Sequence, residues 1–504
     1  MKINWRLIRH IFGVLLLLEA CFMGISTVVA GYYHYAQGEQ DWSALLTCTV
    51  LTLVAGAASW AWGRNHDRKI TTREGFLVVT MAWVVFCLLG MLPYLMLGTC
   101  TDVASAFLEA MSGFTTTGCT VIDNLEEQPH GLLFWRHLTQ WMGGLGIVVF
   151  SLALLPMIGT GATQIFGAET NGLSMDKLRP RIDETARRLW GFYFGLTVAC
   201  AVLYWLGDMS WFDAVCHSFS TMASGGFSTH QDSIGHYHSA YIEYVCIVFL
   251  FITSVNYNLF YMISRGYLRQ AWRNEELRWF AYIVLGATVL FMGLDAFTRQ
   301  NGLIPTEQMA LLGDGSLECS LRSSLFHTLT IISSAGYQAT YFDYDAWGSV
   351  FWLPTLLLMA MGGCSSSTAA GLKMVRCVVL IKNARNQFLH ALMPRSYSTV
   401  RLNGHALPND TVFKILAMLS VYLFLLIISI FVLQLMGLNF ETAIGSAVSA
   451  LGNIGPALGM TGPACTWSWL PAAAKWYLSF LMLVGRLEIF TVIVLFTPMF
   501  WKKY

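Results

Sequence analysis

The stretch SAFLEAMSGFTTTG, which runs from Ser105 to Gly118, decides the fold because the chain contains three further versions of it. The later versions close at Gly226, Gly336 and Gly455, at intervals of roughly 110 residues. Self-similarity at a regular spacing is the signature of a repeat architecture. Four versions of one unit therefore predict a four-fold arrangement of these stretches around a common centre.

Each version carries the same kinds of polar residue ahead of its glycine. A residue that favours helix N-caps stands thirteen positions before it, a hydroxyl six before, and a small polar residue two before. The N-cap candidates are Ser105, Asp213, Ser323 and Thr442. The hydroxyl residues are Ser112, Ser220, Thr330 and Ser449, and the small polar residues are Thr116, Ser224, Ser334 and Asn453. We expect each version to be a capped helix of about three turns that ends in a polar, glycine-containing loop.

The composition is that of a membrane protein. Of 504 residues, 56% are hydrophobic and only 12% are charged, whereas soluble domains carry about 25% charged residues. The chain begins basic and then apolar, like a signal peptide, but it shows no clear cleavage site, so we expect a retained helix. A net charge of +1 argues against nucleic acid as a partner. Of the 12 cysteines, most stand in apolar runs; a disulfide stays possible among Cys100, Cys319 and Cys465.

Ten apolar segments are long enough to cross a bilayer, which takes about 20 residues. They lie at 8–30 and 43–62, then in pairs at 76–98 and 134–157, 189–207 and 241–264, 279–297 and 347–383, and 412–436 and 473–499. The expected fold is an all-α polytopic membrane protein, with ten transmembrane helices and four re-entrant pore helices around one central pore. Its expected parts are two N-terminal helices in 1–70 and pore repeats in 71–175, 176–275, 276–395 and 396–504.

Lysine and arginine are unevenly distributed among the connecting segments. They gather before the first span and in the linkers between units, as at Lys2, Arg6, Arg64, Lys69, Lys177, Arg188, Arg265, Arg278, Lys382 and Arg401. The loops within the units carry instead Asp123, Glu126, Glu127, Asp232, Asp314, Glu318 and Asp343. The positive-inside rule places both termini and the linkers in the cytoplasm. The acidic loops would then gather cations at an outer mouth.

The tips of the four loops read TTTGCT, SGGFST, SAGYQA and NIGPAL. A dehydrated cation needs several oxygen ligands, which backbone carbonyls supply without a formal charge that would trap it. Glycine permits the backbone angles that turn carbonyls inward, and the helices point their partly negative C-termini at the same place. The tips contain no Asp or Glu, which disfavours a divalent-cation site. The alternative is four ordinary turns whose small residues serve helix packing.

Seven distinctive motifs are spread over residues 75–504. They read SGFTTTG (112–118), WRHLTQWMGGLGI (135–147), ASGGFST (223–229), SSAGYQ (333–338), GGCSSSTAAGLK (362–373), LGNIGPALG (451–459) and GRLEI (485–489). Together they resemble the superfamily of Trk, Ktr and HKT potassium transporters, and within it the TrkH-type membrane subunits. The resemblance implies K⁺ uptake through one pore per subunit of a homodimer. It also implies control by a cytoplasmic TrkA-type nucleotide-binding subunit.

The resemblance further implies a selectivity filter lined by the backbone of the four loops. In this family, glycine at all four filter positions goes with K⁺, and serine at the first goes with Na⁺ permeation. This chain has glycine at all four. The filter residues are Thr116, Thr117, Gly118, Ser224, Gly225, Gly226, Ser334, Ala335, Gly336, Asn453, Ile454 and Gly455.

The second span of the third unit concentrates glycine and hydroxyl residues. Each glycine costs about 1 kcal/mol in a helix relative to alanine, so we expect a broken helix with a polar loop below the filter. By resemblance, this loop obstructs the pore on its cytoplasmic side; a close helix contact through small residues is the alternative. The loop residues are Gly362, Gly363, Ser365, Ser366, Ser367, Thr368 and Gly371.

Arg486 stands deep in the last span, where a charge is costly and usually faces a cavity or a partner. By resemblance it is a pore-facing arginine near the gate and a positive barrier to cations. Lys373 could play a similar part. The alternative is a buried pair with a carboxylate or with helix-end carbonyls. Glu488 is not expected to share the helix face of Arg486.

Four polar side chains stand nine positions before the filter glycines, where they could anchor filter loops or carry a proton for coupled transport. Anchoring is favoured, because a proton route needs a continuous chain of groups. These residues are Glu109, His217, His327 and Ser446. Arg136 and Gln140 are expected to brace a loop rather than to touch the ion.

The sequence as a whole indicates a K⁺ uptake protein of the bacterial inner membrane, with the transported ion as its only expected cofactor. A Na⁺-permeable or a Na⁺- or proton-coupled relative on the same scaffold is the alternative, because all would use the same filter. A membrane enzyme is disfavoured, since no metal-ligand cluster, nucleophile motif or Walker sequence is present.

Overall fold

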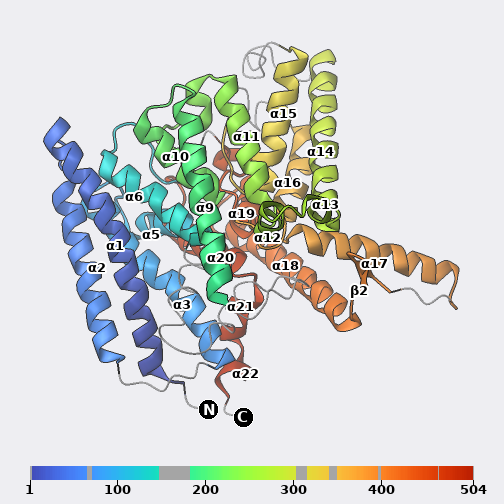
Figure 1. The fold of residues 1–504 in the computed structure, drawn as a ribbon, viewed down its shortest axis with the longest axis horizontal. Coiled ribbons are helices and arrows are strands. Elements are labelled where there is room, and N and C mark those ends of the chain that lie inside the picture. Colours follow the sequence, from blue (N-terminus) through green and yellow to red (C-terminus); the bar gives the residue numbers. More distant parts are fainter. Residues whose placement is uncertain are drawn as a thin grey trace.

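The computed structural model describes residues 3–64, 71–146, 182–301, 315–339, 349–395, 399–463 and 465–502, which are mostly helical (Figure 1). Five helical segments are long and apolar enough to cross a membrane: Trp5–Gln37, Trp42–Trp62, Arg73–Met96, Glu275–Gln300 and Asn409–Leu435. A bent pair, Ala472–Arg486 with Phe490–Phe496, would be a sixth. The chain is therefore a helical membrane protein. The count of ten spans stays a prediction, since 134–157 runs beyond the described residues.

Four short, buried helices correspond to the repeated stretches: α5 (Val103–Phe114), α10 (Trp211–Ala223), α15 (Leu317–Ile332) and α19 (Phe440–Gly452). The remaining helices surround them. They are α1 (Trp5–Gln37), α2 (Trp42–Trp62), α3 (Thr72–Gly90), α4 (Leu92–Met96), α6 (His130–Trp141), η1 (Met142–Gly146), α9 (Ile182–Trp205), η2 (Ser233–Tyr237), α11 (Ala240–Ser254), α12 (Tyr257–Ser264), α13 (Leu268–Trp272), α14 (Glu275–Gln300), η4 (Ser349–Phe351), α16 (Trp352–Met361), α17 (Met374–Leu392), α18 (Asn409–Leu435), η5 (Gly459–Thr461), α20 (Ala472–Arg486), α21 (Phe490–Ile493), η6 (Val494–Phe496) and α22 (Pro498–Trp501). The strands β1 (Arg401–Leu402) and β2 (His405–Ala406) form a small antiparallel pair.

The predicted N-caps of the repeated helices are wrong by one turn or more. The caps are Asp102, Ser210, Ser316 and Asn439, and each accepts a hydrogen bond from a backbone N–H three residues later. In three copies that N–H belongs to the predicted cap: Ser105, Asp213 and Thr442. Ser323 lies inside α15, which starts earlier than the other three helices. In the other three copies, good capping residues occur twice, three positions apart, and the upstream one caps the helix.

Two predicted spans are broken at positions where the sequence did not predict a break. The segment 241–264 is split into α11 and α12, and the last span is bent by 113° after Arg486. At the first break, the backbone groups freed from the helix bond to the third unit: Cys364 N donates to Ser254 O at 2.9 Å, and Tyr257 N donates to Ser366 O at 3.2 Å. The break in 347–383 was expected, and it separates α16 from α17.

The α1–α2 hairpin lies along one side of the molecule (Figure 1). Gly13 permits the close contact, because a β-carbon there would lie 2.3 Å from the backbone nitrogen of Trp60. The turn between the two helices holds the start of α6: Glu39 accepts a hydrogen bond from the backbone N–H of His130 at 3.0 Å and contacts its ring at 2.6 Å. The hairpin is thus attached to the first unit through the turn between α1 and α2.

Both ends of the described chain meet at the start of α3. Asn4 N donates to Glu74 Oε1 at 2.7 Å, and Arg73 donates to the carbonyl of Lys502 at 2.9 Å. Thr71 and Glu74 form a capping box there. The beginning of α1 and the end of the chain near α22 therefore lie on the same side of the molecule, as Figure 1 shows.

The possible disulfide is not formed. Cys100 and Cys319 are buried, Cys465 is exposed, and none of the three is joined to another cysteine.

Candidate functional site

The backbone of the four loops follows one pattern. Two residues before each closing glycine, the chain adopts the left-handed conformation, which is uncommon outside glycine; the φ angles are 53° at Thr116, 53° at Ser224, 56° at Ser334 and 49° at Asn453. The next residue donates its N–H to the carbonyl of the residue five positions earlier. The bonds are Thr117 to Ser112 (2.8 Å), Gly225 to Ser220 (2.9 Å), Ala335 to Thr330 (3.0 Å) and Ile454 to Ser449 (3.1 Å). One local geometry thus recurs four times.

The four glycines Gly118, Gly226, Gly336 and Gly455, here called the ring glycines, bring the loops together. A β-carbon on each would collide with a carbonyl oxygen of the next loop: Gly118 with Gly225 O (2.1 Å), Gly226 with Ala335 O (1.7 Å), Gly336 with Ile454 O (2.0 Å) and Gly455 with Thr117 O (2.5 Å). The contacts pass from the first loop to the second, third and fourth and return to the first, so they close a ring. The φ angles of the ring glycines are 90°, 76°, 72° and 98°, which other residues rarely adopt. Both space and conformation therefore require glycine.

The hydroxyls that the sequence repeats six positions before the ring glycines fasten the loops from behind. Ser112 donates to the carbonyl of Cys119 at 2.6 Å, and the corresponding hydroxyls of Thr330 and Ser449 donate to backbone carbonyls at 3.1 and 2.8 Å. Ser220 differs, because its hydroxyl bonds to the ring of His137 at 2.7 Å. The repeated hydroxyls are visible in the sequence, but the groups that they bind are not.

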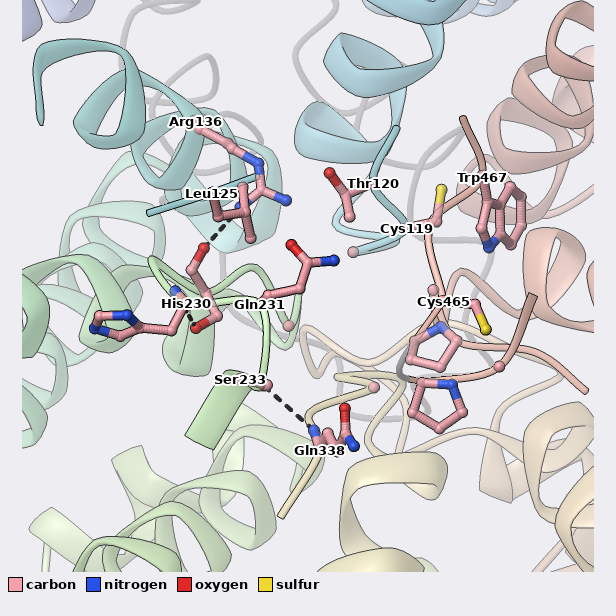
Figure 2. Close-up of a pocket in the computed structure, with 18 residues that line it drawn as sticks. Cys119, Thr120, Leu125, Arg136, His230, Gln231, Ser233, Gln338, Cys465 and Trp467 are labelled. Carbon is pink, nitrogen blue, oxygen red and sulfur yellow. Dashed lines mark hydrogen bonds between the residues drawn. The ribbon is translucent and has the colours of Figure 1, made fainter. Parts of the chain in front are cut away.

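A cavity of about 50 Å³, here called the outer cavity, lies against the ring on the side where the loops continue beyond the glycines. All four ring glycines line it, together with Thr120, Ser228 and Gln338 of the same loops (Figure 2). Further lining comes from His230 and Gln231, which follow the second loop, and from Trp467. Polar groups from several loops therefore converge above one opening.

The acidic residues expected at the outer mouth are largely engaged with other groups. Glu126 accepts a hydrogen bond from the backbone N–H of Gln231 at 2.8 Å. Glu318 pairs with Arg322 at 2.9 Å, and Arg322 also pairs with Glu243 at 2.7 Å. Asp314 and Asp343 lie outside the described residues.

Glu109 and Arg136 form a buried ion pair beside the first loop. Their side chains are 2.7 Å apart and almost fully shielded from solvent. Glu109 accepts hydrogen bonds from Thr120 Oγ1 at 3.1 Å and from Val121 N at 2.9 Å. Arg136 donates to the carbonyl of Ser228 at 2.9 Å. The pair therefore links the first loop to the second.

Gln140 braces the second loop directly. Its amide nitrogen donates to Gly225 O at 2.6 Å, and its oxygen accepts from Phe227 N at 3.1 Å. Arg136 also stacks over the Phe227 ring, with the guanidinium carbon 3.5 Å from the ring centre. These contacts hold the carbonyl that faces Gly118.

The other side chains nine positions before the ring glycines reach different partners. His217 Nε2 lies 2.9 Å from Ser228 Oγ, and Ser446 Oγ lies 3.0 Å from Thr461 Oγ1, so both contact their own unit's outer loop. His327 instead contacts Thr355 of α16 at 3.0 Å. The second unit also reaches a neighbouring loop, because the hydroxyl of Tyr337 in the third loop donates to the carbonyl of His217 at 3.3 Å.

The loop between α16 and α17, residues 362–373, is here called the inner loop. It lies against the ring on the side opposite the outer cavity. Thr368 Oγ1 bonds to Ser224 Oγ at 2.8 Å, and Ala370 N donates to Ser334 Oγ at 2.8 Å. Both partners stand two residues before a ring glycine. The inner loop thus contacts the second and third filter loops directly.

The base of the inner loop is closed by glycines and by a buried carboxylate. Gly362 and Gly371 have φ angles of 71° and 84°, and a β-carbon on Gly362 would lie 2.0 Å from Ala370 O. Glu276 of α14 accepts a hydrogen bond from Ser365 N at 2.6 Å. Lys373, at the end of the loop, donates to the carbonyl of Ala369. Gly363, Ser366 and Ser367 complete the turn of the loop.

Arg486 ends α20 directly beneath the first loop. Its Nη1 donates to Thr116 Oγ1 at 3.1 Å and to the carbonyl of Thr368 at 3.0 Å. Its Nη2 donates to the carbonyls of Gly143 and Gly144 at 2.6 and 3.1 Å. One guanidinium therefore joins the ring, the inner loop and the kink that follows α6.

A buried ion pair between Arg376 of α17 and Glu488 was missed from the sequence. The chain turns out of α20 at Glu488 and Ile489, which both have positive φ angles, 58° and 54°. The sequence did carry a signal, because Arg376 and Glu488 each stand in an apolar span. A charge at membrane depth requires a partner, and these two can serve each other. The bend places Glu488 against α17 instead of beside Arg486.

A closed ring of backbone carbonyls, with a polar cavity on one side and a loop fastened by arginine on the other, is the arrangement of a cation-conducting membrane protein. Comparison with known proteins agrees. The TrkH family, described as cation transport protein, matches residues 43–503. The chain therefore belongs to the TrkH family, and the resemblance read from its motifs is confirmed.

Relatives of this family match over nearly the whole length. The Trk system potassium uptake protein TrkH of Halomonas elongata is 35% identical over 99% of each chain. The protein of the same name from Escherichia coli is 35% identical over 99% of this chain and 100% of its own. The crystal structure of the potassium transporter TrkH from Vibrio parahaemolyticus superposes with a TM-score of 0.85, at 32% identity, over 99% of this chain and 100% of that one. These relatives are named for transport, not for an enzymatic reaction.

Proposed function

We propose that this protein takes up K⁺ across the bacterial inner membrane through the ring of backbone carbonyls. The observation that carries the proposal is the cyclic contact of the four ring glycines with the carbonyls of Thr117, Gly225, Ala335 and Ile454. Neutral carbonyl oxygens replace the hydration shell of a monovalent cation and release it again. The names of the full-length relatives specify potassium. Glycine at all four positions favours K⁺ over the Na⁺-permeable alternative.

The inner loop and Arg486 act together as the gate of this pathway. The inner loop contacts Ser224 and Ser334 from below, and Arg486 bonds to both Thr116 and Thr368. A cation that leaves the ring meets this positive charge at short range, which opposes its passage. Opening then requires the inner loop and the guanidinium to separate.

The proposed orientation places both termini in the cytoplasm. It rests on the distribution of lysine and arginine and on the meeting of Asn4 and Lys502 at one end of the molecule. The basic linkers on that side are the docking site for a TrkA-type regulatory subunit, and the functional form is a homodimer; both assignments rest on the family resemblance.

The decisive experiment measures ⁸⁶Rb⁺ and ²²Na⁺ uptake into proteoliposomes that contain the purified protein, with and without a protonophore. Rb⁺ uptake in preference to Na⁺, insensitive to the protonophore, is the expected result. Uptake that follows the proton gradient would favour the coupled alternative, and equal uptake of both ions would refute the filter assignment. Growth of a bacterial strain without its own K⁺ uptake systems at low K⁺ provides the test in cells.

A further inference from the structure

Two glutamine side chains stand over the ring in the outer cavity. Gln231 follows the second loop and Gln338 lies two residues beyond Gly336, so they come from different units. Both line the same cavity as the ring glycines. Figure 2 shows the carboxamide of Gln231 extended across the cavity toward Thr120, with Gln338 at the edge below it.

The backbone holds both glutamines in place. Gln231 N donates to Glu126 Oε1 at 2.8 Å. Gln338 N donates to Ser233 Oγ at 3.3 Å, and its carbonyl accepts from Gly235 N at 3.1 Å. The two carboxamides are therefore presented on fixed stems above the ring.

Their side-chain oxygens are withheld from solvent yet accept no hydrogen bond from the described residues. A shielded amide oxygen without a donor is unfavourable, because it loses its hydration and gains nothing in return. Two such oxygens in one small polar cavity indicate a ligand that supplies a hydrogen-bond donor or a positive charge. A monovalent cation fits this donor set, since neutral amide oxygens match the backbone carbonyls of the ring and lack the charge that would retain a divalent ion.

We propose that the Gln231 and Gln338 carboxamide oxygens form an outer K⁺ site, in which the ion exchanges part of its hydration shell before it enters the ring. This inference rests on the proposed function. The carboxylate of Glu126, held by the backbone N–H of Gln231, adds a favourable field without becoming a ligand. The site sets the affinity for external K⁺, while the ring sets selectivity.

The test measures the K⁺-competable ⁸⁶Rb⁺ uptake of proteoliposomes as a function of external Rb⁺. Gln231→Met and Gln338→Met keep the length of the side chain and remove the oxygen. We expect each to raise KM by about two- to tenfold, the effect of losing one polar ligand, and to leave the maximal rate unchanged. Gln231→Glu keeps an oxygen ligand, so its KM should stay at or below that of the unchanged protein.

Gln128→Met is the matched control. Its amide lies in an outer loop but bonds to Thr99 Oγ1 and the carbonyl of Asn124, at 2.9 and 3.0 Å, away from the cavity lining. KM should not change there. Should Gln231→Met fail to accumulate, Gln231→Asn is used in its place. Its side chain is shorter by one methylene, which draws the oxygen back from the ion, so KM should again rise.

Unchanged KM in both methionine variants would mean that the oxygens hold only water, and it would overturn the site. A fall in maximal rate without a change in KM would show a structural role and would also overturn it. Absence of Rb⁺ uptake by the unchanged protein would instead refute the proposed function, so the two failures are distinguishable.

Discussion

The change Gly118→Ser tests the ring most directly. The β-carbon of the new serine would lie 2.1 Å from the carbonyl oxygen of Gly225. That oxygen must retreat by about 1 Å to reach even a tight contact. The same oxygen accepts a hydrogen bond from the amide nitrogen of Gln140 at 2.6 Å, and its retreat would strain that bond. The substitution therefore displaces one ligand of the ring instead of merely filling space.

The size of the effect follows from two separable terms. A side chain at a φ of 90° costs about 1–2 kcal/mol in backbone strain. The displaced ligand costs about another 1 kcal/mol of ion binding, which corresponds to a roughly fivefold change in an equilibrium constant. Gly437→Ser isolates the first term, because Gly437 has a φ of 96° and no heavy atom within 4 Å of a β-carbon. Both variants should lose stability, but only Gly118→Ser should lose selectivity.

The assay compares ⁸⁶Rb⁺ and ²²Na⁺ uptake by the two variants and the unchanged protein in proteoliposomes. The Rb⁺/Na⁺ ratio should fall at least about fivefold in Gly118→Ser and stay constant in Gly437→Ser. A ratio that is unchanged in Gly118→Ser, in protein that folds and inserts normally, would refute the assignment of these carbonyls to the selectivity filter. An equal fall in both variants would show that backbone strain alone is responsible.

Three further predictions concern the surroundings of the ring. Arg486→Gln removes the positive charge between the ring and the inner loop, so ion flux should rise; equal or lower flux in well-folded protein would contradict the gate. Glu109→Gln leaves the buried Arg136 without its carboxylate and should lower the free energy of unfolding by about 3–5 kcal/mol. The double variant Glu109→Leu with Arg136→Met removes both charges, so it should lower the free energy of unfolding by less, as measured by thermal unfolding. Burial lowers the pKa of His236 in the outer loop, and electrostatic repulsion from the neighbouring His230 ring lowers it further. The unfolded chain therefore binds this proton more readily, so stability should be lost as the pH falls below the ordinary value of 6.5 and toward the lowered pKa; melting curves of His236→Gln should show a smaller loss.

The recurring parts of the site could be predicted from the sequence because their geometry is local. The left-handed residue, the ring glycine and the hydroxyl six positions before it, which fastens three of the four loops, all lie within seven residues of one another. Four occurrences of such a pattern leave few other structures open. The glycine content of residues 362–371 likewise predicted the break in the third unit, since the helix-breaking residues are in the break itself.

The remaining breaks and links could not be predicted, because their causes are remote in sequence. The gap between α11 and α12 is stabilised by two hydrogen bonds with another unit, one donated by Cys364 N and one accepted by the carbonyl of Ser366. The bend after Arg486 is accompanied by the pairing of Glu488 with Arg376. The helical period of each span gave no sign of either, because it reports only on neighbours within a few turns.

The contacts of the inner loop bound the energy of the proposed gate. Among the hydrogen bonds of the described residues, three that join the inner loop to the ring and to Arg486 are Thr368 to Ser224, Ala370 to Ser334, and Arg486 to Thr368. At about 0.5–1.5 kcal/mol each, their loss costs a few kcal/mol. A difference of that size holds the closed state in large excess, yet the binding of a partner to the cytoplasmic side can overcome it. The fourth loop takes part in none of these three hydrogen bonds; Asn453 donates instead to Thr117 Oγ1 and to the carbonyl of Met482 in α20, the helix that ends at Arg486. Movement of α20 would therefore reach the ring and the gate together, which makes this helix the expected link between a regulatory partner and the pore.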